Sequence, residues 1–318
     1  MSEYSPFLNT NRYAVVTGAN KGIGFEICKQ LASHDGVTVI LTARDPTRGR
    51  EAVERLSQCP GLAGRLLFHQ LDVADAASVA ALAGFVNSEF GRLDILVNNA
   101  AIGGAEVDAD ALKARMAASQ GAGGNLLDGI TVQTYERAEA CLNTNYYGVK
   151  RMIEAFIPLL ELSDSPRIVN VSSRMGLLKN INNEWAKGIF IKAENHTEEE
   201  VDEVVKVFLQ DFKEGSHTEK GWPQTGCAYI VSKAALNAYT RVVAKKYPTL
   251  GINCVCPGYV KTDLNFNTGV LTLEEGAETP VMSTMLPFRE SISKVKLLKL
   301  RLKWIRLFSW ELRPKYMK

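Results

Sequence analysis

Tyr229 and Lys233 stand four residues apart in the stretch AYIVSK, so a helix would place both side chains on one face. A carbonyl group that accepts a hydride develops negative charge on its oxygen and needs a hydroxyl that gives up its proton there. A tyrosine hydroxyl has an ordinary pKa of about 10, too high for easy proton loss at neutral pH. A lysine ammonium one turn away favours the phenolate and lowers that pKa. The spacing therefore predicts a proton-donating pair.

Ser173 is a second hydroxyl that could act on the same oxygen. It follows the apolar run RIVNVS at residues 167–172, which we expect to form a buried strand. Open α/β sheets bind ligands at the carboxyl ends of their strands, so this position suits a hydrogen-bond donor. For each of these three residues alone, the alternative is an ordinary polar residue of a helix or loop.

Short apolar runs alternate along the chain with longer amphipathic runs. The short runs suit parallel strands that are buried on both faces, and the longer runs suit the helices that cover them. This alternation predicts one α/β domain over residues 1–280, a doubly wound parallel sheet with right-handed crossovers. We expect strands at residues 13–17, 37–42, 65–73, 93–98, 167–172 and 252–257, and helices at residues 22–34, 46–58, 75–90, 134–161 and 228–247.

Two insertions interrupt the alternation. Residues 102–133 are rich in Gly, Ala and Asp and predict a mobile flap. Residues 174–227 contain an amphipathic helix whose start, Thr197 with Glu200, fits a capping box. We expect the apolar stripe of this helix to pack on the body of the domain, and it could also wall a pocket, because the segment leads directly to Tyr229.

A glycine trio lies between the first expected strand and the first expected helix. Gly18, Gly22 and Gly24 stand in the stretch VVTGANKGIGFEI. Glycines let the backbone turn sharply and approach a diphosphate, while the amides at a helix start supply donors and a positive dipole end. In this context the motif predicts a Rossmann-type dinucleotide site, with a turn that binds no ligand as the alternative.

The residues after the second strand favour NADP over NAD. A site for NAD usually has an acidic residue there, but this chain has Ala43 and Arg44, with Arg48 one helical turn later. Lys21 adds a third cation, and together they suit a 2′-phosphate. Asp45, which precedes a proline, is expected to cap the helix. A solvated basic helix start and an NAD-linked alcohol dehydrogenase are the alternatives.

Composition and charge exclude several other classes. The net charge of +2 gives no reason to expect nucleic acid. The six cysteines are scattered and the four histidines lack ligand spacing, so we expect reduced thiols and no metal site. The first residues lack the pattern of a signal peptide, and no run has the roughly 18 apolar residues of a membrane span. The protein is therefore expected to be cytoplasmic.

Seven motifs occur in the order of a known family. With TGANKGIG, LDV, NNAA, LNTNYYG, VNVSS, YIVSK and CPGYVKTD, the chain resembles the short-chain dehydrogenase/reductase family over residues 12 to about 280. Ala101 stands where that family usually has glycine. The segment between Ser173 and Tyr229 is unusually long for the family. In this feature the chain resembles the monomeric carbonyl reductases, and above all the plant members of that group. This likeness implies a monomer.

The resemblance implies NADPH-dependent reduction of a ketone or aldehyde, a small-molecule substrate, with Tyr229 as proton donor. Lys233, Ser173 and Asn145 would complete the catalytic set, and the family counterparts of Asn145 hold a water that links the lysine to solvent. Asp72 would meet the adenine ring and Thr262 the nicotinamide carboxamide. The implied cofactor-binding residues are Thr17, Gly18, Asn20, Lys21, Gly22, Ile23, Gly24, Arg44, Arg48, Asp72, Val73, Asn98, Pro257, Gly258, Val260 and Thr262.

The C-terminal tail, residues 281–318, is foreign to the rest of the chain. Residues 291–318 hold nine Lys or Arg and one Glu, and KVKLLKLRLKWIRLFSW forms an apolar arc opposite a basic one on a helical wheel. Such a segment can lie on an anionic membrane, pack on the body or pack poorly. The alternative function is therefore an NADP-binding protein with little catalysis, whose pocket edge the tail has altered and which could attach to membranes through it.

Overall fold

A six-stranded parallel sheet forms the centre of the protein, whose computed structural model describes residues 11–118 and 129–285. The strand order is β3-β2-β1-β4-β7-β8, which confirms the doubly wound sheet expected from the sequence. The order reverses between β1 and β4, the switch point where such sheets bind ligands. The strands are β1 (Arg12–Val16), β2 (Val37–Ala43), β3 (Leu66–Gln70), β4 (Ile95–Asn98), β7 (Arg167–Val171) and β8 (Gly251–Val255).

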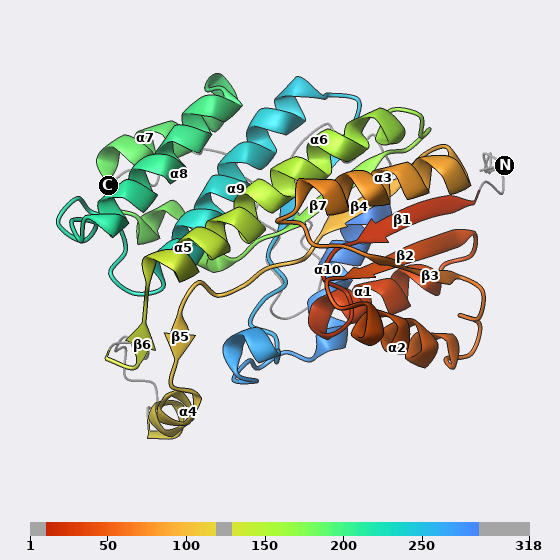
Figure 1. The fold of residues 1–318 in the computed structure, drawn as a ribbon, viewed down its shortest axis with the longest axis horizontal. Coiled ribbons are helices and arrows are strands. Elements are labelled where there is room, and N and C mark those ends of the chain that lie inside the picture. Colours follow the sequence, from red (N-terminus) through yellow and green to blue (C-terminus); the bar gives the residue numbers. More distant parts are fainter. Residues whose placement is uncertain (1–10, 119–128, 286–318) are drawn as a thin grey trace, which may run out of the picture.

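Helices cover both faces of this sheet (Figure 1). On one face lie α1, α2 and α10, and on the other α3, α5, α6 and α9. Each face has its own apolar core, because successive strand residues face opposite sides: Val15 belongs to one cluster and Val16 to the other. The helices are α1 (Gly22–Ala32), α2 (Pro46–Ser57), α3 (Ala76–Phe90), α5 (Tyr135–Leu142), α6 (Gly148–Leu160), α9 (Cys227–Lys246) and α10 (Leu273–Met285).

The helix expected over residues 134–161 is divided in two. α5 ends at Leu142 and α6 begins at Gly148, with a single π-helical turn over Asn143–Tyr147 between them. Periodicity over a long apolar stretch does not reveal such a turn, because the apolar face continues through it. π turns concentrate at functional sites, and this one carries Asn145.

The first insertion projects from the body of the domain (Figure 1). It contains the short antiparallel pair β5 (Glu106–Val107) and β6 (Thr131–Val132), with α4 (Ala109–Ala118) between them. Residues 119–128 of the expected flap lie outside the described residues.

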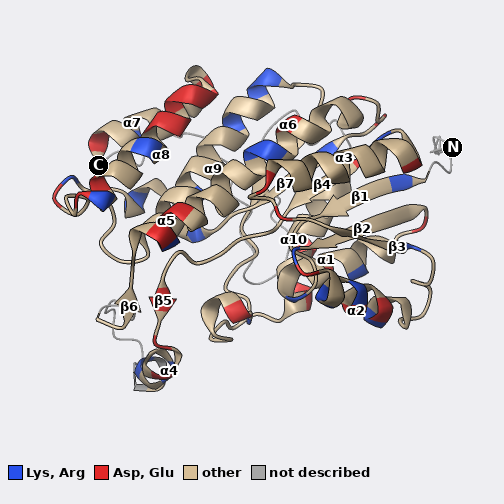
Figure 2. Cartoon of the chain, in the orientation of Figure 1, with Lys and Arg blue, Asp and Glu red and all other residues tan. Residues whose placement is uncertain are grey.

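The second insertion forms a helical layer beside α5 and α9. α8 (Glu198–Lys213) begins with the expected capping box, in which Thr197 and Glu200 bond reciprocally. Its acidic first turn is red in Figure 2. Asp202, in the next turn of the helix, attaches it to α6 and the π turn: its carboxylate accepts hydrogen bonds from the Tyr146 hydroxyl and from Lys150 Nζ, both at 2.7 Å. Shorter elements, α7 (Glu184–Ile191) and the 3₁₀ turns Leu178–Asn180 and Ala193–Asn195, were not expected from periodicity.

The expected boundary after residue 280 falls within α10, which runs to Met285. The basic tail from residue 286 onward lies outside the described residues. In the described part of the chain, no helix is long and apolar enough to cross a membrane. The same residues contain no group of His, Cys, Asp and Glu side chains that could hold a metal ion.

Candidate active site

The glycine loop between β1 and α1 has the shape of a phosphate cradle. Gly18 and Gly22 have φ angles of +64° and +63°, a region that other residues adopt only with strain. A Cβ on Gly18 would lie 2.8 Å from the Cα of Ala100, and a Cβ on Gly24 would lie 2.5 Å from the Nδ2 of Asn99. The loop can therefore pack against the chain that follows β4 only with glycine at these positions.

The start of α1 leaves its backbone amides available to an anion. Its N-cap, Lys21, makes no side-chain capping bond, and no acidic residue lies in the first turn. Uncapped amides and the positive end of the helix dipole favour a phosphate group. Asn20 and Ile23, which were also predicted to bind cofactor, lie partly exposed on the same loop and first turn. This arrangement fits the diphosphate of a dinucleotide.

Asn99, which the sequence analysis did not single out, ties the glycine loop to β4. Its Nδ2 donates to the carbonyl oxygens of Thr17 at 2.9 Å and Gly18 at 3.1 Å. The Thr17 hydroxyl accepts from the backbone amides of Asn99 and Ala100, both at 2.9 Å. The predicted Thr17 thus supports the loop from beneath.

The predicted Asn98 side chain turns the opposite way. It is buried and donates to Asn170 Oδ1 at 2.9 Å, under α9. Neighbouring residues of an extended chain face opposite sides, so only one asparagine of the NNAA motif can meet the glycine loop. Any contact of Asn98 with a cofactor would therefore involve its backbone. Strand alternation was the signal that could have identified Asn99.

Two arginines, Arg44 and Arg48, lie just after the end of β2, and they differ in their ion-pair partners. Asp45 caps α2 as expected, because its Oδ1 accepts from the amides of Thr47 and Arg48 at 2.9 and 3.1 Å. Arg48 also pairs with Asp45, with Nε 3.6 Å from Oδ2. Among the described residues no acid pairs with the exposed Arg44, which leaves this cation the most available for a phosphate.

Asp72 and Val73 follow β3, the strand at one edge of the sheet. Asp72 Oδ1 accepts from the amide of Ala74 at 2.9 Å, so its side chain turns the chain into α3. Val73 is buried against Gly148, where a Cβ would lie 2.8 Å from Val73 Cγ2. Both predicted residues therefore have structural partners in addition to any adenine contact.

The segment after β8 faces the glycine loop. Pro257 and Gly258 lead to Val260, which is buried, and to Thr262, whose Cγ2 lies 3.9 Å from the point a Cβ of Gly22 would occupy. Lys21 and Asp263 join the two segments, with Nζ 2.5 Å from Oδ2. The predicted cofactor residues of the glycine loop and those of the segment after β8 therefore lie next to each other at the carboxyl ends of the strands.

The helix α9 carries the predicted catalytic pair. Lys233 is 3% exposed, and its Nζ donates to the carbonyl oxygen of Val171 at 2.8 Å. The same nitrogen lies 5.7 Å from the centroid of the Tyr229 ring. Burial lowers the pKa of Lys233 to about 8, because the charged form loses its hydration.

Ser173 lies at the carboxyl end of β7 and meets Tyr229. It begins a 3₁₀ turn, Arg174–Gly176, and its Oγ accepts from the amide of Met175 at 3.1 Å. Burial raises the pKa of Tyr229 above its ordinary value, while a hydrogen bond with Ser173 lowers it. Desolvation is the larger of these two effects, so the pKa of Tyr229 is raised in the protein without a cofactor. The lowering expected from Lys233 together with an oxidised nicotinamide stays a prediction. The Tyr229 hydroxyl keeps its proton at neutral pH and remains a donor.

Asn145 anchors the chain after β4 to α9. Its Nδ2 donates to the carbonyl oxygen of Ile102 at 2.9 Å and to Ser232 Oγ at 3.1 Å, and its Oδ1 accepts from the Ile102 amide at 2.9 Å. The side chain therefore reaches the residue before Lys233 rather than Lys233 itself. The π turn supplies this inward position.

Comparison with known proteins decides the family. The family profile described as short chain dehydrogenase matches residues 12–186, and that described as Enoyl-(Acyl carrier protein) reductase matches residues 214–286. (+)-Neomenthol dehydrogenase of Arabidopsis thaliana is 61% identical over 285 residues, which are 89% of this chain and 95% of that protein. The chain belongs to the short-chain dehydrogenase/reductase family.

Two further relatives of this short-chain dehydrogenase/reductase are informative. The solved structure of salutaridine reductase from Papaver somniferum has a TM-score of 0.82 at 51% identity, and the match covers 87% of this chain and 96% of that one. Carbonyl reductase [NADPH] 1 of Bos taurus is 37% identical, over 88% of this chain and 92% of that protein. The protein is an oxidoreductase, and its fold is that of enzymes with a nicotinamide cofactor.

Proposed function

We propose that this short-chain dehydrogenase/reductase is an NADPH-dependent reductase that converts a ketone or aldehyde to an alcohol. The observation that carries the proposal is the meeting of Ser173 and Tyr229, two hydroxyls from different elements, beside the buried Lys233. Two donors that converge on one point suit an oxygen that gains negative charge. The site lies at the carboxyl ends of the strands, where the glycine loop would hold the dinucleotide.

The reduced nicotinamide would supply the hydride, and residues of the chain would bind the carbonyl oxygen and donate a proton to it. Ser173 would donate one hydrogen bond to that oxygen, and Tyr229 would donate a second and then transfer its proton. The ammonium of Lys233, held by the Val171 carbonyl, would stabilise the phenolate that remains. We assign to Asn145 the support of a water path from Lys233 to solvent.

NADPH is the preferred cofactor in this proposal. The exposed Arg44, without an acidic partner among the described residues, stands at the end of β2 where a site for NAD would have an acid. Arg48 follows in the first turn of α2, where a cation is unfavourable for the helix dipole and favourable for a phosphate ligand. The name of the bovine relative includes NADPH, which agrees with this preference.

The substrate would be a small molecule with a carbonyl group, as the names of the relatives suggest for those proteins. The two insertions, residues 102–133 and 174–227, would set its shape, because the first follows β4 and the second joins Ser173 to the helix that carries Tyr229. We further propose a monomer, because α8 covers α5 and α9 in this chain. Light scattering after gel filtration tests this: a particle of 35.0 kDa is expected, and a stable dimer would contradict it. The cytoplasmic location stays a prediction from the sequence.

The test of the proposal compares wild type with Tyr229→Phe on a panel of cyclic ketones, with NADPH oxidation followed by absorbance. Loss of a general acid typically lowers kcat by about 10²–10⁴-fold, and NADPH binding should not change. Tyr13→Phe is the control, because this residue lies near the start of β1, at the amino ends of the strands and away from Ser173. Retained turnover in Tyr229→Phe would contradict the role of Tyr229. Tight NADPH binding by wild type without turnover of any carbonyl would favour the non-catalytic alternative.

A further inference from the structure

The turn that carries Ser173 is held at both ends by one side chain of α9, that of Asn237. Asn237 lies one helical turn after Lys233 and is 7% exposed. Its Oδ1 accepts from Ser172 Oγ at 2.7 Å, and its Nδ2 donates to the carbonyl oxygen of Gly176 at 3.1 Å. Ser173 lies between these two anchor points. The position of its hydroxyl therefore depends on a residue that the family motifs do not include.

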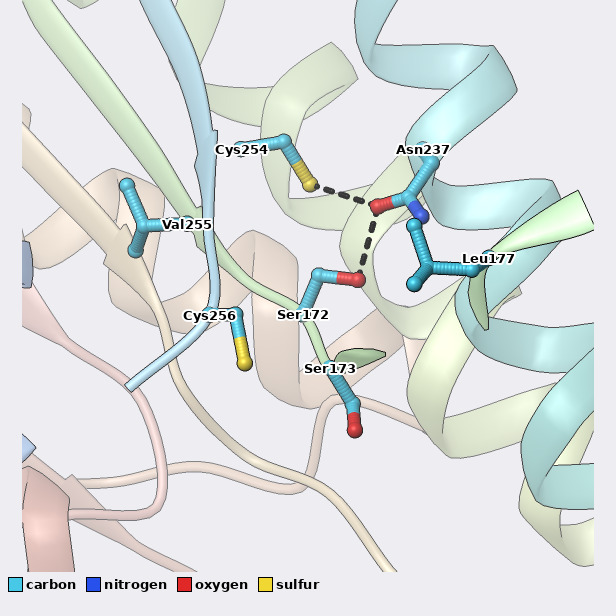
Figure 3. Close-up of a pocket in the computed structure, with 7 residues that line it drawn as sticks. All are labelled: Ser172, Ser173, Leu177, Asn237, Cys254, Val255 and Cys256. Carbon is cyan, nitrogen blue, oxygen red and sulfur yellow. Dashed lines mark hydrogen bonds between the residues drawn. The ribbon is translucent and has the colours of Figure 1, made fainter. Parts of the chain in front are cut away.

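The same amide joins a third element. Cys254 on β8 donates from its Sγ to Asn237 Oδ1 at 3.0 Å, as Figure 3 shows together with the bond from Ser172. In the same view the Ser173 side chain points away from Asn237. Asn237 thus binds the buried neighbour of Ser173 and leaves the Ser173 hydroxyl free to face Tyr229.

Lys233 completes the attachment of this turn to α9. Its Nζ bonds the carbonyl of Val171, the residue before Ser172. Gly176 lies against the Lys233 backbone so closely that a Cβ would be 2.6 Å from its carbonyl carbon. Two residues of one helix face, Lys233 and Asn237, therefore bind the chain from Val171 to Gly176, and that helix also carries Tyr229.

The packing beside the turn leaves a small space. A cavity of about 10 Å³, close to the volume that one water needs, lies beside it. Its lining residues are Ser172, Ser173, Leu177, Asn237, Cys254, Val255 and Cys256. On this side of the turn, the hydrogen bonds of Asn237 to Ser172 and Gly176 add to the packing in fixing its position.

We propose that Asn237 is a positioning residue, which holds Ser173 at the distance from Tyr229 where both hydroxyls can bond one substrate oxygen. This inference rests on the proposed function, because it assigns Asn237 a task in that reaction. Asn237 itself does not touch the reacting atoms: its side chain is buried beneath the turn. Hydrogen bonds lose strength steeply with distance and angle, and a displacement of about 1 Å can lower a rate by about 10²-fold.

The experiment compares three variants. Asn237→Leu keeps the shape and removes both anchors, while Ser172→Ala removes one anchor and provides the test if the first variant folds poorly. Ser163→Ala is the matched control: its hydroxyl also donates to a buried side-chain oxygen, that of Asp94, but at the amino ends of the strands. The readouts are kcat and KM for a ketone, the Kd for NADPH, thermal unfolding, and hydrogen exchange of the peptide over residues 172–178.

We expect kcat to fall by about 10–100-fold in Asn237→Leu and about 3–10-fold in Ser172→Ala, with the Kd for NADPH within about twofold of wild type. A double variant that combines Ser172→Ala with Asn237→Leu should be no slower than Asn237→Leu, because Asn237→Leu already removes the anchor that Ser172 makes. Exchange at Met175 and Gly176, whose amides bond Ser173, should accelerate in both variants and not in Ser163→Ala.

A folded Asn237→Leu variant with wild-type kcat would overturn the inference and leave the proposed function intact. The inference would also fail if Ser163→Ala lowered kcat as much as Ser172→Ala at equal loss of stability. If wild type itself reduced no carbonyl, the proposed function would fall. Hydrogen exchange would then still decide the inference, since unchanged exchange over residues 172–178 in Asn237→Leu would overturn it.

Discussion

Gly176 rests directly on the backbone of Lys233: a Cβ at Gly176 would lie 2.6 Å from the carbonyl carbon and 2.8 Å from the carbonyl oxygen of Lys233. The turn that presents Ser173 and the helix that presents Tyr229 are therefore in contact at the level of their main chains. The relative position of the two hydroxyls therefore depends on this contact as well as on the hydrogen bonds of Asn237.

Gly176→Ala should separate the Ser173 turn from α9. The new methyl group has no space against a helix backbone, so we expect kcat to fall by about tenfold or more, with a lower unfolding temperature. Gly84→Ala is the control, because a Cβ there meets nothing within 4 Å on the exposed face of α3. That change should stabilise the protein slightly and leave kcat unchanged. Wild-type kcat in Gly176→Ala would contradict the importance of this contact.

The activity should depend on the charge of Lys233. Because burial lowers its pKa to about 8, the ammonium is present below that pH and lost above it. We therefore expect kcat/KM for ketone reduction to be constant near neutral pH and to decline above pH about 8, since this ratio reports groups of the free enzyme. Lys233→Arg, which stays charged, should move the decline to higher pH even if turnover is lower. Lys246→Arg should leave the profile unchanged, and the same decline in Lys233→Arg would exclude this lysine as its cause.

Arg44→Ala should reduce the preference for NADPH. Loss of a cation beside a 2′-phosphate weakens NADPH binding and leaves NADH binding nearly unchanged, so the ratio of the two kcat/KM values should fall by about tenfold or more. Arg55→Ala is the control, because that side chain lies over the Phe25 ring at the other end of α2. Equal losses with both cofactors would show that Arg44 acts on the fold rather than on the phosphate.

Lys21→Ala should have a smaller effect than Arg44→Ala on NADPH binding. Lys21 is already paired with Asp263, and both side chains are mostly exposed, at 60% and 62%. An exposed pair contributes less than about 1 kcal/mol, so thermal unfolding should change little. Fluorescence titration of NADPH against each variant makes the comparison. A larger loss in Lys21→Ala would mean that the pair opens and that Lys21 binds the cofactor phosphate.

Tyr146→Phe should loosen the inserted helix α8. The Tyr146 hydroxyl, fully buried, donates to Asp202 at 2.7 Å, and loss of a hydrogen bond to a charged acceptor costs about 1.5–3 kcal/mol of the free energy of unfolding. Tyr135→Phe removes a comparable bond to Glu139 at an exposed position and should change stability little. Urea unfolding of both variants measures the difference. Equal stabilities would show that α8 is held by its apolar stripe alone.

The sheet and its main helices were predictable because local periodicity and tertiary burial agree in them. The run VTVILT is apolar because β2 is buried on both faces, and it was found within a residue of its bounds. The capping box of α8 was predictable for the same reason, since Thr197 and Glu200 are neighbours through the local turn. The π turn at Asn143–Tyr147 was not, because it changes the helix without changing its apolar face.

The order of the elements, the glycine loop, and the residue types Tyr229, Lys233 and Ser173 that a hydride-transfer site needs can be read directly from the residues. How these side chains are held becomes visible only in the folded chain. Asn99 rather than Asn98 meets the glycine loop, and Asn237 binds both ends of the Ser173 turn. Spacing along a chain reports only which face a residue occupies within its own helix or strand. Burial and hydrogen-bond partners depend on elements that are distant in the sequence, and so does the raised pKa of Tyr229.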